Sequence, residues 1–393
     1  MIRGLFCHSL QIYRDKNGVY CSTTLTNELF SRYYQVVDSL VVATRIVQIE
    51  TTYEEAHQDK IDLPNLKIVG FENLNNPKTF LTQYGAEKRK MEKLVQKSDL
   101  IFIRGGVIAI LGAEVSKDLD KPYLVESASC AWDEYWHYSL LGKFVAPVME
   151  YKTKKIIKNA DFVLYVTEKW LQKRYPTKAK TTYASNVIID SADDEVLEKR
   201  LRKINYCSKK RLVFGTTGGI STKAKGQHYM IQAMAMLRKK YDIRYEIVGG
   251  GDTAFLRSVA HKFGVEDKVV FKGQLTHNEV LQWLDSIDIY VQPSMQEGLP
   301  RALIEAMSRG CPAIGSTTAG IPELLEQDVV FKRGKPKDLK RKIEILCNGS
   351  LKKRAIRNFN KAQEYELKKL NVRREKIYSA YLEHVLKRKQ NEN

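Results

Sequence analysis

Short apolar runs rich in β-branched residues alternate with amphipathic stretches along the whole chain. Near-continuous apolar strands separated by helical segments are typical of parallel sheets covered by helices on both faces. In the first half the expected strands are 39–47, 66–71, 99–105, 122–127 and 162–167. In the second half they are 211–217, 244–250, 268–273, 287–292 and 312–316. The pattern predicts an α/β fold with two doubly wound sheets.

The two series of strands are separated by a charged segment, 188–210, in which we find no convincing buried strand. We expect this segment to link a Rossmann-like domain of residues 1–187 to a second one of residues 211–360. A basic helical segment, 361–393, then ends the chain. A length of 393 residues suits two such domains. Ligands bind beyond the carboxyl ends of the strands in doubly wound sheets, so the cleft between the facing domains is the expected site.

The formal net charge of +19 is unevenly distributed. Residues 332–393 contain 20 Lys and Arg against 7 Asp and Glu, and residues 199–211 contain seven basic residues and no acidic one. Two interpretations stay open: a solvated basic surface, or attraction to an anionic partner such as a membrane leaflet or a polyanion.

The composition also bears on the compartment. No apolar run approaches the roughly 18 residues that cross a bilayer, and the first residues lack the apolar core of a signal peptide. The six cysteines are scattered without a C-x-x-C pair, which indicates reduced thiols rather than disulfides or a zinc site. We therefore expect a cytoplasmic protein, with peripheral contact at the inner face of the plasma membrane as an option.

The stretch 292–324, QPSMQEGLPRALIEAMSRGCPAIGSTTAGIPEL, is the most informative about function. Glu297 lies in a turn after an apolar run, and Glu305 lies eight residues later in the next helix. A buried helical carboxylate suits the two hydroxyl donors of a ribose. A carboxylate beside the backbone N–H groups of a helix entrance suits the hydroxyls of a sugar. Each glutamate alone is explained as well by a structural role.

A glycine-rich turn, FGTTGGISTKAKG at 214–226, follows a strand and leads into a helix. Exposed N–H groups in such a turn can receive phosphate, and Lys225 adds a positive charge for a diphosphate. The turn matches neither the Walker pattern nor G-x-G-x-x-G, so it is a weak signal by itself.

Together these motifs resemble the retaining glycosyltransferases of family 4, which have the GT-B fold. The similarity extends over nearly the whole second half, through EIVGGGD, VVFKGQL, DIYVQPS and GCPAIGS, and its centre matches the family's E-x7-E signature. The resemblance implies that Glu305 binds the nucleotide ribose and that Lys225 neutralises the diphosphate. It implies that Glu297, as the catalytic residue, and the backbone of Gly298 and Leu299 contact the donor sugar.

The chain departs from the family pattern in two places. Gly219 and Ile220 stand where the family usually has an arginine that helps to bind the diphosphate; Lys223 or Arg301 could substitute. Many members also have a histidine near the reacting sugar, for which Asp133 and His137 are the acceptor-side candidates here.

The first half offers looser matches. The turn DKNGVYCSTT resembles the glycine loop through which the family's N-terminal, acceptor-side domain faces the donor, which makes Gly18 a donor-binding candidate beside Gly219. RYYQVVDSLVVATR and NADFVLYVTEKWLQKRYP resemble members that build bacterial surface polysaccharides.

The expected reaction moves a hexose from a nucleoside diphosphate sugar, UDP-sugar preferred, to a hydroxyl of a polysaccharide or lipid-linked saccharide precursor, with retention. The single Asp-x-Asp triplet, Asp118-Leu119-Asp120, lies in a polar turn before a strand, so we expect neither a metal nor another cofactor. One alternative is a catalytically silent GT-B scaffold of a polysaccharide synthesis complex. Another is a basic nucleic-acid-binding protein, but no recognised module supports it, and we expect no nucleic-acid partner.

Overall fold

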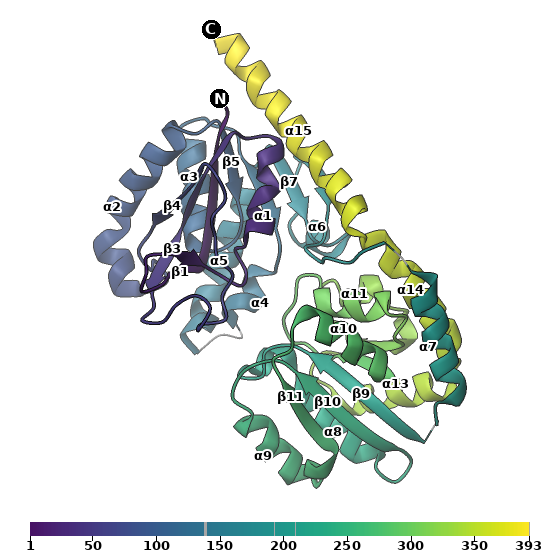
Figure 1. The fold of residues 1–393 in the computed structure, drawn as a ribbon. Helices are drawn as coiled ribbons and strands as arrows, with labels where there is room; N and C mark the ends of the chain where they lie inside the picture. The colour runs from purple at the N-terminus through teal and green to yellow at the C-terminus, as the bar shows by residue number, and fades with distance from the viewer. Residues whose placement is uncertain (137–139, 192, 209, 393) are drawn as a thin grey trace.

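The computed structural model describes residues 1–136, 140–191, 193–208 and 210–392, and its strands form two parallel sheets that are each covered by helices (Figure 1). The part built on the first sheet is called the first half below, and the part built on the second sheet the second half. Every predicted strand is present, with ends that differ by at most two residues from the predicted ones. The predicted α/β fold with two doubly wound sheets is confirmed.

The first sheet is parallel except for a short strand, β2, which pairs antiparallel with β1. Its remaining strands lie in the spatial order β4 (Leu66–Gly70), β3 (Ser39–Gln48), β1 (Arg3–Arg14), β5 (Leu100–Ile103), β6 (Leu124–Ser127), β7 (Phe162–Tyr165) and β8 (Lys180–Tyr183), with β2 at Tyr20–Cys21.

The second sheet is parallel in all its pairings. Its strands lie in the order β11 (Val269–Gly273), β10 (Asp242–Val248), β9 (Arg211–Thr217), β12 (Ile289–Gln292), β13 (Ala313–Ser316) and β14 (Val330–Phe331).

Both sheets share the Rossmann order, in which the third, second and first strands are followed by the fourth and those after it. The direction of winding reverses between β1 and β5 in the first sheet and between β9 and β12 in the second. Loops diverge at such a switch point and leave a crevice at the carboxyl ends of the strands. The fold alone therefore directs attention to the residues that follow β9 and β12.

The helices fill both faces of the sheets. Those of the first half are α1 (Asn27–Ser31), α2 (Pro77–Gln96), α3 (Gly106–Asp118), α4 (Ala131–Trp136), α5 (Leu140–Lys158) and α6 (Trp170–Arg174). The later helices are α7 (Asp194–Tyr206), α8 (Gln227–Leu237), α9 (Ala254–Phe263), α10 (His277–Ser286), α11 (Arg301–Ser308), α12 (Ile321–Leu324), α13 (Pro336–Asn348), α14 (Leu351–Ala362) and α15 (Leu367–Glu392).

Four strands, β1, β2, β8 and β14, were not predicted from the sequence. In β1 the polar residues His8, Ser9 and Gln11 interrupt the apolar run, and the pairing with β3 shifts register between Cys7 and Gln11. The other three have two to four residues, too few for an alternating or continuous apolar pattern.

The predicted linker contains a helix, α7, that binds the second half through its basic side chains. Arg200 donates hydrogen bonds to the carbonyls of Leu284, Ile287 and Arg309. Lys203 donates to the Ile287 carbonyl at 2.7 Å as well. Cations stabilise the exposed carbonyls at helix ends, so part of the basic run at 199–211 serves the packing of α10 and α11.

The C-terminal helix α15 leaves the second half and runs along the first (Figure 1). Its apolar stripe is buried, including Leu370, Ile377 and Val385. Tyr378 donates a hydrogen bond to the buried Glu126 carboxylate at 2.5 Å, and Tyr381 donates to the Pro122 carbonyl at 2.9 Å. Helix α15 therefore completes the core of the first half and connects the two halves.

Candidate functional site

The crevice at the β9–β12 switch point begins with a glycine-rich turn. The Gly218 N–H binds the Val248 carbonyl at 2.9 Å, and the Ile220 N–H binds the Gly250 carbonyl at 3.1 Å. A Cβ on Gly249 would lie 2.2 Å from the Gly218 oxygen, so the two turns touch through backbone alone. Between these contacts Gly219 is exposed, and a Cβ there would meet nothing within 4 Å. The turn is rigidly held while its Gly219 backbone faces open space.

Lys225 enters the crevice from the end of this turn. Gly226, which follows it, has the left-handed φ of 68° and begins α8. A Cβ on Gly226 would lie 2.0 Å from the Pro293 oxygen, so only glycine permits this approach of the loop after β12. The Met295 N–H binds the Ala224 carbonyl at 2.7 Å and joins the two loops again. Two loops separated by about 70 residues are thus locked side by side.

The result of this locking is an ion pair between Lys225 and Glu297. The Lys225 Nζ lies 2.7 Å from the Glu297 Oε1, and the Glu297 side chain is only 9% exposed. Gln292 donates to the same oxygen at 3.1 Å and accepts a hydrogen bond from the Tyr290 hydroxyl at 2.9 Å. The carboxylate is therefore oriented from two sides, which is what a preorganised charge in a binding site requires.

The turn that carries Glu297 also touches the first half. A Cβ on Gly298 would lie 1.9 Å from the Ala128 oxygen, which follows β6. The Gly320 N–H binds the Gly298 carbonyl at 2.9 Å from the other side. Among the hydrogen bonds of the described residues, none is donated by the backbone N–H groups of Gly298 or Leu299. Both groups are thus available at the entrance of α11.

Glu305 lies in the second turn of α11 and is half-buried. Burial raises the pKa of its carboxyl, while the charges of Arg301 and His277 act in the opposite direction. No hydrogen bond or ion pair joins this carboxylate to another side chain in the described part of the chain. A desolvated carboxylate without a protein partner has its hydrogen-bonding capacity left for a ligand.

Among the described residues, no hydrogen bond or ion pair joins Glu297 to either cation suggested as a replacement for the family arginine. The Lys223 Nζ lies over the Phe255 ring, 4.6 Å from its centroid, in a cation–π contact. Arg301 is exposed, and its charge acts on Glu305. Lys225 is the cation that the structure brings to Glu297.

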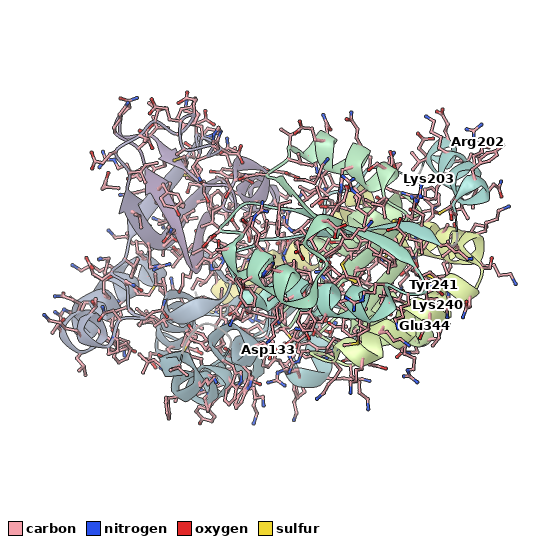
Figure 2. The ribbon with its side chains drawn as sticks, turned by 90° about the horizontal axis from the view of Figure 1, so that it is seen from below. Asp133, Arg202, Lys203, Lys240, Tyr241 and Glu344 are labelled. Carbon is pink, nitrogen blue, oxygen red and sulfur yellow. The ribbon has the colours of Figure 1, made fainter. Side chains whose placement is uncertain are left out.

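Of the two acceptor-side candidates, His137 lies outside the described residues. Asp133 is buried and pairs with Arg333 of the second half, with an Nη1–Oδ1 distance of 3.2 Å. Figure 2 shows Asp133 at the border between the two halves. The Arg333 Nη1 also donates to the Met295 carbonyl at 3.0 Å, so this ion pair joins the first half to the loop that carries Glu297.

Gly18 lies in the tight turn between β1 and β2, where its N–H binds the Asp15 carbonyl at 2.9 Å. Its φ of 82° requires glycine. Among the described residues, no hydrogen bond joins this turn to the second half, and its role toward the donor stays a prediction.

A cavity of about 530 Å³ lies where the halves meet. Its lining includes Trp132, Glu150, Lys154 and Arg174 from the first half and Ala319 and Arg333 from the second. Glu150 is buried, and its Oε1 lies 2.9 Å from the Arg174 Nη2. The site therefore extends from the Lys225–Glu297 pair toward a mixed aromatic and charged cavity.

Sequence reasoning missed several residues of this site. Arg333 follows β14, a strand of two residues that the apolar pattern did not predict. Glu134, hydrogen-bonded to Ser129 beside the Gly298 turn, has its pKa raised by burial. Gln292 could have been noticed, because a polar residue at the end of an apolar strand often points into the crevice.

Asp118 and Asp120, of the Asp-x-Asp triplet, precede β6. They therefore lie at the amino end of that strand, away from the carboxyl ends where ligands bind. Each pairs with a cation, Lys88 at 3.0 Å and Arg388 at 2.7 Å.

A search of the described helices finds none with the length and apolar character that a membrane span requires.

Residues 197–363 match the family model described as Glycosyl transferases group 1. Over 387 residues the chain is 28% identical to Protein CapJ of Staphylococcus aureus, covering 96% of this chain and 95% of the relative. It is 36% identical over 115 residues to the putative colanic acid biosynthesis glycosyltransferase WcaL of Escherichia coli, which covers 27% of this chain and 28% of that relative.

Solved structures show the same fold at low identity. Sucrose-phosphate synthase from Thermosynechococcus elongatus superposes with a TM-score of 0.65 at 15% identity, covering 97% of this chain and 99% of that one. HepE of Anabaena, solved with UDP and glucose, gives a TM-score of 0.61 at 18% identity, covering 95% and 98%. The fold is GT-B, and residues 197–363 are similar to the glycosyl transferases of group 1.

Proposed function

We propose that this protein transfers a hexose from a nucleoside diphosphate sugar to a hydroxyl of a polysaccharide or lipid-linked saccharide precursor, with retention of anomeric configuration. The observation that carries the proposal is the Lys225–Glu297 pair at 2.7 Å. A cation beside a phosphate-ready turn and a carboxylate beside a helix entrance are what a sugar nucleotide needs at the two ends of its scissile bond.

In the proposed complex the ribose hydroxyls donate to Glu305, whose carboxylate has no partner among the described side chains. The diphosphate lies against the Gly219 turn and Lys225. The transferred sugar lies at Glu297 and the N–H groups of Gly298 and Leu299. Binding of the diphosphate would draw Lys225 away from Glu297 and leave that carboxylate to the sugar hydroxyls.

The chemistry breaks the bond between the anomeric carbon and the diphosphate oxygen and forms a bond to the acceptor oxygen. Negative charge grows on the leaving diphosphate, where Lys225 and the N-terminus of α8 stabilise it. Glu297 stabilises the positive charge that develops on the sugar. Attack from the same face as the leaving group retains the anomeric configuration without a protein nucleophile, and the acceptor proton passes to the leaving phosphate.

The relatives support the substrate classes. HepE was solved with UDP and glucose, which favours UDP as the nucleotide. WcaL and the Erwinia amylovora protein AmsK are named for the biosynthesis of colanic acid and amylovoran, both polysaccharides. We place the protein in the cytoplasm, in peripheral contact with the anionic inner face of the plasma membrane.

A panel of nucleoside diphosphate sugars, screened by thermal stabilisation and donor hydrolysis, tests the donor assignment. We expect one UDP-hexose to raise the melting temperature and to be hydrolysed slowly. Nuclear magnetic resonance of the product's anomeric proton then reads retention or inversion. A silent scaffold would bind a donor without turning it over, and a nucleic-acid-binding protein would bind no donor.

A further inference from the structure

Helix α5 carries large apolar side chains on its solvent face. Leu140, Leu141, Phe144, Val148 and Tyr151 are exposed to 78, 57, 80, 54 and 67%. Leu141, Phe144, Val148 and Tyr151 are spaced by three or four residues, and Leu140 lies four residues before Phe144, so all five lie on one face of the helix. We call these five residues the α5 ridge. Scattered exposed apolar residues are ordinary, but a contiguous set on one helix marks an interaction surface.

Other exposed apolar residues lack this clustering. Leu81 on α2 is 84% exposed, and no other large apolar residue of that helix is exposed among those the structure describes. The opposite face of α5 packs normally, through the buried residues Ala146, Met149, Ile156 and Ile157. The ridge is therefore a surface of a well-packed helix.

Basic residues continue the same face toward the end of α5. Lys155 and Lys158 are exposed, whereas the Lys154 Nζ lies 3.4 Å from the Glu150 Oε1. The acidic residue of the helix, Glu150, is buried against Arg174. The exposed face of α5 is therefore mainly apolar from Leu140 to Tyr151, with Lys143 beside it, and positive at Lys155 and Lys158.

Lysine and tryptophan also flank the start of the ridge. The Lys143 Nζ lies 5.8 Å from the Trp136 ring centroid, and Trp136 stacks on Trp132 at 5.1 Å. Tryptophan and lysine beside an apolar helix face are typical of helices that lie in the membrane–water interface.

We propose that α5 docks on an anionic bilayer leaflet, with the α5 ridge inserted below the head groups and its terminal lysines bound to lipid phosphates. The positive face argues for lipid over a second copy of this chain, because two such faces would repel each other. Part of the other basic segments is engaged within the protein, since Arg200 and Lys203 bind helix ends and Lys389 pairs with Asp99.

This surface would hold the interdomain cavity close to the membrane. Glu150 and Lys154 of α5 line that cavity together with Arg174 and Arg333. Ten residues of helix separate Phe144 from Lys154, about 15 Å along the axis. This step builds on the proposed function: a saccharide acceptor linked to a membrane lipid would reach the cavity from the leaflet on which α5 rests.

The test is flotation of the full-length protein with vesicles of phosphatidylglycerol and phosphatidylcholine, compared with pure phosphatidylcholine. The variant Leu141→Gln/Phe144→Gln removes the centre of the ridge, and Leu81→Gln is the matched control for an equally exposed side chain. We expect the double variant to bind anionic vesicles at least about tenfold more weakly, since each inserted side chain contributes apolar burial. Leu81→Gln should bind like the wild type. A third variant, Lys155→Gln/Lys158→Gln, should weaken binding at low salt and have little effect at high salt.

Equal binding by the wild type and the ridge variant would overturn the proposal, as would equal loss in Leu81→Gln. A wild-type dimer that the ridge substitutions dissociate, with no vesicle binding, would instead assign the ridge to a second copy. Circular dichroism of each variant checks the fold. Flotation measures binding without turnover, so its failure is separate from failure of the proposed transferase activity.

Discussion

The two halves share one strand order but use the carboxyl ends of their strands differently. In the second half, glycine turns lock the loops after β9 and β12 together, and the Lys225–Glu297 pair results from this contact. In the first half, β1 has a register shift in its pairing with β3. The segment after β6 leads into α4 and α5, and α5 carries the exposed ridge. In the proposed transferase, a common fold would therefore supply a rigidly held donor side in the second half and an exposed apolar helix face in the first.

The comparison is tested most strongly by Glu297→Gln, which removes the charge at the centre of the proposed donor side. We expect transfer to fall about 10²–10³-fold, the loss typical when one preorganised electrostatic group is removed. The melting temperature should change little, because glutamine retains the hydrogen-bonding capacity toward Gln292. Steady-state rates with the donor found in the screen measure the effect.

Glu344→Gln is the matched control for that variant. Glu344 also pairs with lysines, Lys240 at 3.2 Å and Lys340 at 2.8 Å. Figure 2 shows Glu344 beside Lys240 and Tyr241, far from Asp133 and the border of the halves. Equal activity loss in both variants would remove the special role of Glu297.

The contact between the halves is tested by Gly298→Ala. Its Cβ would lie 1.9 Å from the Ala128 oxygen, so one half must move away from the other. A displacement of about 1 Å at a reacting centre can lower turnover by about 10²-fold. The comparison variant Gly219→Ala adds a Cβ into open space, so it should preserve stability and weaken donor binding alone. Normal turnover of Gly298→Ala would show that closure at this turn is not needed.

The ion pair across the border is tested by Arg333→Ala. Asp133, whose side chain is 8% exposed, would lose its partner from the second half. We expect a loss of about 1–2 kcal/mol in the free energy of unfolding, moderated because Arg333 is 39% exposed and screened by solvent. Urea denaturation measures it, and Asp133→Asn/Arg333→Ala should recover part of the loss. No recovery in the double variant would show that the pair is not the cause.

The smallest effect concerns Glu305, whose pKa burial raises. A carboxyl with a raised pKa in the folded state stabilises the protein while it is protonated. That contribution is lost as pH rises through the folded-state pKa. Glu305→Gln should therefore melt slightly higher than the wild type at neutral pH without donor, and the difference should shrink in acid. The donor should bind the variant more weakly, because glutamine offers the ribose one acceptor oxygen in place of two.

Most of the fold could be predicted from the sequence because the buried parallel strands are continuous apolar runs. The strands that escaped were β1, broken by polar residues, and three very short ones. The role of α7 could not be predicted, since Arg200 and Lys203 bind carbonyls at helix ends that are distant in sequence.

Some residues of the candidate site were also visible in the sequence. The spacing of Glu297 and Glu305 and the glycine turn before Lys225 were visible as motifs. The contact between Lys225 and Glu297 depends on the close approach of Gly226 to Pro293. The Asp133–Arg333 pair depends on the placement of the two halves. Both are tertiary features without a local pattern. The α5 ridge was hidden for the same reason, because an apolar stripe does not reveal whether the fold covers it.

Isothermal titration calorimetry of the UDP-hexose selected by the screen, with the wild type and Lys225→Gln, tests the donor site most directly. We predict that the wild type binds with one site per chain. Lys225→Gln should bind at least about tenfold more weakly, because it loses a charge-assisted contact to the diphosphate. Equal affinity in the two proteins, or no binding of any nucleoside diphosphate sugar by the wild type, would contradict the assignment of the β9–β12 crevice as the donor site.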